Sequence, residues 1–178
     1  MLTLALVLAG GAALDGRTPP EAASAQPAAA APPAPAMPHG AEVKRRFDEA
    51  VVMLHAGQHE HALVALHRVL ALAPTMPEAH VNMGFALLGL NRAQQARDFF
   101  DSAIALQPQQ ANAYYGLALA WEAAGDLAMA TGAMRSYLHL ARDERPQHLR
   151  RARAALWEWE QARASAPPAS ALAPEAGR

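Results

Sequence analysis

The chain has 178 residues, enough for one domain of moderate size with extensions. Its formal net charge of −1 argues against a dedicated binder of polyanions, so we expect no nucleic acid partner. It contains no cysteine, which excludes disulfides, thiolate metal sites and lipidated cysteines.

Residues 1–16 carry an apolar run from Leu2 to Leu14 that predicts export. The run is too short for a membrane-spanning helix of about 20 residues but fits the core of a signal peptide. Small residues at 11–13 and 23–25 offer two cleavage sites. We therefore expect a periplasmic protein whose mature chain has no stable membrane span. Because no lysine or arginine precedes the run, a cytoplasmic chain with an unstructured N-terminus is the alternative.

Alanine and proline dominate residues 17–41 and 165–178. Such stretches have too few bulky apolar side chains and backbone donors to pack as helices or strands. We expect a semi-extended linker over 17–41 and a disordered tail over 165–178, with the folded domain between them.

A constant spacing of 34 residues organises the middle of the chain. The segments AGQHEHALVALHRVLALAP (56–74), LNRAQQARDFFDSAIALQP (90–108) and AGDLAMATGAMRSYLHLAR (124–142) align without gaps. A further helix is expected before each of them, beginning near residues 43, 77 and 111. Residues 42–142 therefore hold three helix–turn–helix units, 43–76, 77–110 and 111–144. This pattern predicts an all-α solenoid, in which each unit buries its apolar face against its neighbours. An ordinary antiparallel bundle is the alternative.

Small residues and prolines recur at fixed places in these units. They are Ala50, Gly84 and Ala118 in the first helices, Ala62, Ala96 and Ala130 in the second helices, and Pro74 and Pro108 after them. With the 34-residue period, this pattern resembles the tetratricopeptide repeat, W-x2-L-G-x2-Y, then A-x3-F, then P. The resemblance covers residues 43–142 and implies a right-handed helical solenoid whose inner side binds ligands.

Gly84 lies in the middle of an expected helix, where glycine costs about 1 kcal/mol relative to alanine. Facing small residues let two helix backbones approach closely, and we expect Gly84 and Ala96 to meet in this way. Gly57 and Gly125 fall between paired helices, where a left-handed backbone ends a helix. Asn91 takes the same place in the middle unit.

The segment 145–164 predicts one more helix, with Pro146 suited to its first turn. Its apolar residues follow helical spacing along one side: Leu149, Ala152, Leu156 and Trp159. We expect this helix to cap the exposed end of the third unit. The alternative is a basic docking patch of Arg150, Arg151 and Arg153, although a charge run is more often a solvated face.

No residues form a recognisable catalytic motif, nucleophile elbow or glycine-rich phosphate loop. His55, His59 and His61 surround Gly57, and a His-x3-His pair binds zinc when both side chains share one helix face. Because Gly57 is expected to end the helix between them, we expect surface histidines and no metal site. We therefore expect a protein that is not an enzyme and has no cofactor.

Apolar residues next to the packing positions of the first helices form rows with the 34-residue period. The rows are Phe47, Val81 and Tyr115; Val51, Phe85 and Leu119; and Leu54, Leu88 and Glu122, with Asn82 and Asn112 nearby. They predict an apolar groove on the inner side for an amphipathic helix or extended apolar peptide, including the chain's own Ala/Pro arm. Modules of this type that clamp a terminal carboxylate use basic and asparagine side chains here. This chain offers only the two asparagines, so that specificity is not supported. The alternative is that Val81, Phe85 and Leu88 pack against the preceding repeat.

The sequence thus predicts a protein–protein interaction module that acts as a scaffold or assembly factor. Two other functions remain as alternatives. One is a domain for homo-oligomerisation, and the other is RNA binding, which some helical repeats perform but which the near-neutral charge disfavours.

Overall fold

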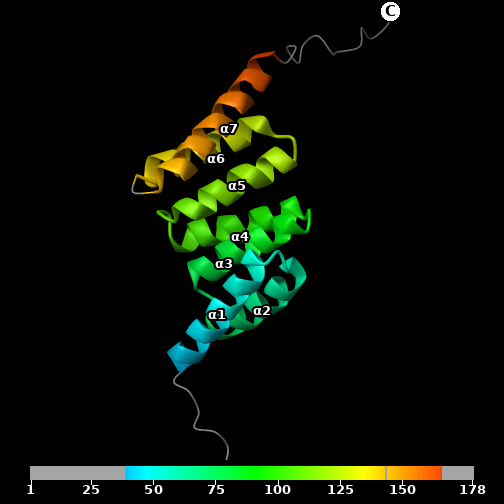
Figure 1. The fold of residues 1–178 in the computed structure, drawn as a ribbon, viewed down its shortest axis with the longest axis vertical. Helices are drawn as coiled ribbons and strands as arrows, with labels where there is room; N and C mark the ends of the chain where they lie inside the picture. The colour runs from blue at the N-terminus through cyan, green and yellow to red at the C-terminus, as the bar shows by residue number, and fades with distance from the viewer. Residues whose placement is uncertain (1–38, 143, 166–178) are drawn as a thin grey trace, which may run out of the picture. The chain divides into compact units, whose positions relative to one another are not determined.

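The computed structural model describes residues 39–142 and 144–165, and all regular structure in these ranges is helical. The helices are α1 (His39–His55), α2 (His59–Leu72), α3 (Pro77–Gly89), α4 (Ala93–Leu106), α5 (Ala111–Ala123), α6 (Leu127–Leu140) and α7 (Pro146–Ser165). Each helix packs on the next one in the chain, α1 also contacts α3, and α3 contacts α5 (Figure 1). This arrangement confirms the predicted all-α helical-repeat solenoid.

The turn inside each unit has a left-handed residue at the same place. The φ angles are +71° at Gly57, +58° at Asn91 and +80° at Gly125, and the three positions are 34 residues apart. Glycine and asparagine are the residues that adopt this conformation at low cost. The predicted helix-ending turns are therefore confirmed in all three units.

The recurring small residues are buried between the paired helices, as the repeat pattern predicts. Gly84 is buried. The alanines of this set have no solvent exposure: Ala50, Ala62, Ala96, Ala118 and Ala130. The partner of Gly84 differs from the expected Ala96. The atoms nearest to a Cβ placed on Gly84 belong to the Phe100 ring, at 2.6 Å from Cε1 and Cζ. The glycine therefore makes room for an aromatic ring of α4, because a methyl group there would overlap it.

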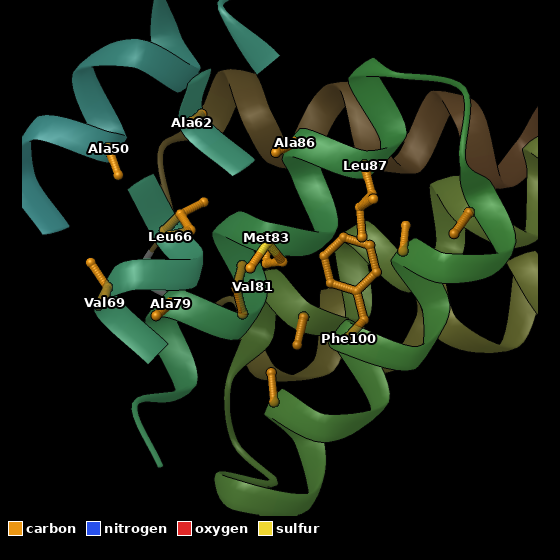
Figure 2. Close-up of a cluster of buried hydrophobic side chains, with 14 residues drawn as sticks. Ala50, Ala62, Leu66, Val69, Ala79, Val81, Met83, Ala86, Leu87 and Phe100 are labelled. Carbon is orange, nitrogen blue, oxygen red and sulfur yellow. The ribbon is translucent and has the colours of Figure 1, made fainter. Parts of the chain in front are cut away.

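Gly116 of α5 meets the same ring from the next unit, and a Cβ on Gly116 would lie closer still to Phe100. The ring is completely buried and belongs to the core cluster of the first two units, which also includes Ala113 and Ala120 of α5. Figure 2 shows the Phe100 ring beside Leu87 in this cluster. Phe100 thus fills the space between α3 and α5 that the two glycines leave open.

Two equivalent hydrogen bonds tie consecutive units together. His80 Nε2 donates to the carbonyl oxygen of Pro74 at 2.9 Å, and the Tyr114 hydroxyl donates to that of Pro108 at 3.1 Å. Both prolines end a unit, and both donors stand in the first turns of the next one. The two bonds join the start of each new unit to the segment that follows the second helix of the unit before it.

α7 packs against α6, the last helix of the third unit. Its residues Ala152 and Trp159 are buried with Ala130, Met134 and Tyr137 in a second core cluster. The indole Nε1 of Trp159 donates to Glu122 Oε1 at 2.9 Å, which satisfies the polar atom of a buried aromatic side chain.

The helix ends differ slightly from the expected boundaries. α1 begins at His39, inside the range expected for the linker, and His39 Nε2 lies 3.3 Å from the carbonyl oxygen of Leu72 in α2. The expected signal peptide, the rest of the linker and the tail after residue 165 lie outside the described residues. Within residues 39–142 and 144–165, none of the helices has the length and hydrophobicity needed to cross a bilayer.

Candidate functional site

A groove of about 590 Å³ is lined by side chains from six of the seven helices. Its lining residues are Leu54 and His55 of α1, His59 of α2, Asn82 and Phe85 of α3, Asn112 and Tyr115 of α5, Tyr137 of α6, and His148 and Arg151 of α7. Each of the three units contributes, because the first helices lie side by side and α7 follows the last unit.

The floor of the groove is apolar and connected to the core. Phe85 packs edge-on against the buried Phe100, with ring centroids 5.2 Å apart and an interplanar angle of 71°. Tyr115 packs against Tyr137, with ring centroids 5.1 Å apart. Aromatic pairs of this kind stabilise their own arrangement. The floor therefore has a fixed shape to which an apolar ligand side chain can fit.

The polar rim is formed by imidazole, guanidinium and amide side chains. His55 and His59 come from the α1–α2 turn, and His148 and Arg151 come from the first turns of α7. No aspartate or glutamate lines the groove in the part of the chain that the structure describes. Glu144 contacts one of the rim residues, because its Oε2 lies 3.3 Å from His148 Nδ1.

Tyr137 of α6 lines the groove and is only 3% exposed. Burial raises the pKa of its hydroxyl above the ordinary value, and the charge of Glu144 and the neighbouring Tyr115 act in the same direction. The phenol is therefore protonated near neutral pH and serves as a hydrogen-bond donor or acceptor.

The His59 ring packs directly on the backbone of α3 at Gly89, where a Cβ would overlap the ring atoms. Its Nδ1 is buried and has no hydrogen-bond partner among the described residues. This close packing holds the imidazole at the edge of the groove.

The predicted rows divide between groove and core. Asn82, Phe85 and Tyr115 line the groove, together with Leu54 and Asn112 from the same prediction. Val81 does not face it, because its side chain is only 4% exposed and belongs to the core. The remaining row residues lie outside the lining. Phe47 and Leu88 pack on the first core cluster, and Leu119 packs on the second. Val51 is half-buried, and Glu122 accepts the hydrogen bond of Trp159.

Sequence reasoning missed Tyr137, His148 and Arg151 as residues of this site. Arg151 appeared only within a proposed basic patch with Arg150 and Arg153, neither of which lines the groove. His55 and His59 were considered as metal ligands and then expected to be surface histidines, not residues of a groove. Among residues 39–142 and 144–165, no three histidine or carboxylate side chains gather as a metal site would require.

Comparison with known proteins shows that the fold of this chain is a recurrent one. The family model for the tetratricopeptide repeat matches residues 53–112. No curated protein matches the chain in sequence.

Several solved structures share the fold at low sequence identity. The Yersinia enterocolitica type III secretion translocator chaperone SycD is 12% identical, with a TM-score of 0.66 over 70% of this chain and 88% of that one. PcrH in complex with the chaperone binding region of PopD is 17% identical, with a TM-score of 0.64 over 70% of this chain and 95% of that one. The first repeat domain of Spaghetti (RPAP3), bound to an HSP90 peptide, is 20% identical, with a TM-score of 0.63 over 70% and 95%. The chain therefore has the fold of a tetratricopeptide-type solenoid.

Proposed function

We propose that this tetratricopeptide-type solenoid is a non-enzymatic interaction module that holds a peptide segment of a protein partner in its groove, as a scaffold or assembly factor. The observation that carries the proposal is the groove itself, which all three units and α7 build together around an apolar floor. A groove with a preformed floor binds a ligand at lower entropic cost than a surface that must first be ordered.

The similar structures support this proposal. SycD is a translocator chaperone, PcrH is seen with a segment of PopD, and the RPAP3 domain is seen with an HSP90 peptide. The names of these three structures thus each refer to a protein partner or to a segment of one.

A bulky side chain placed in the groove tests the proposal without disturbing the core. Asn112 lines the groove and is exposed, so Asn112→Trp fills the groove while the helix is kept. Gln94→Trp on α4 is the matched control, because Gln94 is exposed and lies outside the groove. We expect the control to capture the same partner from the native source as the unchanged protein, and Asn112→Trp to lose it.

Equal capture by Asn112→Trp and Gln94→Trp would place the partner elsewhere and contradict the proposed site. Light scattering of the purified protein tests the alternative function, which is self-association. A particle of several copies that Asn112→Trp dissociates would show that the groove serves homo-oligomerisation instead.

We also propose that the protein is exported and works in the periplasm. The proposal rests on the apolar run of residues 2–14, the small residues after it and the Ala/Pro-rich segment that follows.

A further inference from the structure

We infer that the groove selects a segment in which an apolar side chain is flanked on both sides by carboxylates, with Arg151 of α7 as the main anchor for the charge. This inference rests on the proposed function and adds the chemistry of the partner. It gives α7 a role in recognition besides its packing on α6.

The charge of the lining carries the inference. The chain as a whole has a net charge of −1, yet the groove gathers three imidazoles and one guanidinium, and no carboxylate lines it among the described residues. Aspartate or glutamate in a bound segment can therefore pair with the Arg151 guanidinium and accept hydrogen bonds from the imidazoles, whereas lysine or arginine finds no carboxylate among the described lining residues.

The positions of these groups define the pattern of the ligand. His55 and His59 belong to the first unit, and His148 and Arg151 belong to the helix after the last unit. The apolar floor, which includes Phe85 of α3 and Tyr115 of α5, comes from the elements between them. An apolar side chain on the floor therefore has cationic or imidazole groups on both sides of it.

Arg151 is the residue best placed to bind a carboxylate. It is exposed, it lines the groove, and no carboxylate of the described residues forms an ion pair with it. His148, by contrast, already contacts Glu144, and Arg135 on α6 is paired with Glu160 at 2.7 Å. A guanidinium binds a carboxylate through two parallel hydrogen bonds, and the exposed guanidinium of Arg151 can offer both to a ligand.

A set of synthetic peptides with blocked ends tests this recognition. The acidic peptide is acetyl-Gly-Asp-Glu-Leu-Phe-Leu-Glu-Asp-Gly-amide with a fluorescent label, and its matched control replaces each Asp by Asn and each Glu by Gln. Because both peptides lack a terminal carboxylate, only side-chain charge differs. By fluorescence anisotropy with the full chain, we expect the acidic peptide to bind about tenfold more tightly at low salt, and the difference to shrink as salt is added.

Two neighbouring arginines identify the anchor. Arg151→Gln should remove most of the preference for the acidic peptide and leave binding of the neutral peptide unchanged. Arg150→Gln should change neither, because Arg150 is equally exposed but lies outside the groove.

The outcomes separate this inference from the proposed function. If both peptides bind equally and Asn112→Trp abolishes both, the groove binds peptides but the charge selection is wrong. If neither peptide binds, the inference is also wrong, and the partner-capture experiment with Asn112→Trp still decides the proposed function. Tight binding of a single-stranded RNA that depends on Arg151 and displaces the acidic peptide would overturn the assignment to a peptide.

Discussion

Phe100 is completely buried and meets a glycine on each of two helices that belong to different units. The first helices of neighbouring units could not leave space for this ring with alanine at both positions. Each glycine weakens its own helix by about 1 kcal/mol relative to alanine. Burying the phenylalanine side chain contributes roughly 1.5 to 3 kcal/mol, which is comparable to the combined cost of the two glycines.

Adding a methyl group at Gly116 tests this close packing. Gly116→Ala gains helix propensity but overlaps the Phe100 ring, and we expect a net loss of about 1 to 3 kcal/mol in the free energy of unfolding, as overpacked cores show. Gly132→Ala is the control, because Gly132 is helical and exposed and a Cβ there meets no atom within 4 Å. It should stabilise the protein by about 0.5 to 1 kcal/mol. Urea denaturation measures both changes.

The double variant Gly116→Ala, Phe100→Leu identifies the ring as the cause. Leucine is smaller, so its combination with Gly116→Ala should cost less than the sum of the two single changes. Strict additivity would show that Gly116 is required for another reason.

At the level of residues, the sequence was informative wherever a position followed the period. Gly57, Asn91 and Gly125 were predictable because a helix-ending turn requires a left-handed residue once in each unit. Gly116 was not predictable in this way, since the middle unit has Asn82 at its position. The contact between Gly116 and Phe100 is known only from the structure, which places the ring between α3 and α5.

The second helices of the three units begin with different caps. The Asp126 side chain accepts a hydrogen bond from the backbone N–H of Met129 at 3.0 Å, whereas Gln58 and Arg92 make no such bond at the equivalent positions. We expect Asp126→Ala to lower the free energy of unfolding by about 0.5 to 2 kcal/mol. Gln58→Ala is the control and should have little effect. A comparable loss in the two variants, measured by thermal unfolding, would argue against the cap.

α7 contains two tryptophans in contrasting environments. Trp159 is 5% exposed and bonded to Glu122, while Trp157 is 63% exposed. We expect Trp159→Ala to cost about 3 to 5 kcal/mol, because it leaves a cavity in the second core cluster. Trp157→Ala should stay within about 0.5 kcal/mol of the unchanged protein, as surface substitutions do. Denaturant unfolding, followed by circular dichroism, measures both changes. Equal stability of the two variants would contradict the packing role of Trp159 in α7.

At the level of elements, the period predicted the groove residues of α3 and α5 but not those of α7. The prediction placed Phe85 and Tyr115 in the periodic rows with Asn82 nearby, and all three line the groove. The equivalents of Tyr115 and Asn82 in the neighbouring units, Val81 and Gly116, are buried instead. Residues 145–164 lie outside the repeats, so the spacing does not say which side of α7 faces the groove. The division between core and groove was equally hidden, because Val81 and Phe85 follow the same period although only Phe85 lines the groove.

The proposed export is a property of the whole molecule and has a direct test. Protein purified from its native source should lack at least residues 1–13, because cleavage follows the apolar run. Intact mass measurement and N-terminal sequencing would show this. An intact Met1 would contradict export through a cleaved signal peptide.

The place of Phe100 between Gly84 and Gly116 also bears on how such a chain can change in evolution. Repeat arrays commonly grow or shrink by duplication and deletion of whole units. Here the middle unit supplies the ring and one glycine, and the following unit supplies the other glycine at a position where its own predecessor has asparagine. A second copy of the middle unit inserted after the first would place Asn82 against the ring. Duplication of the middle unit, or deletion of either unit, would therefore change the contact between this ring and its second glycine.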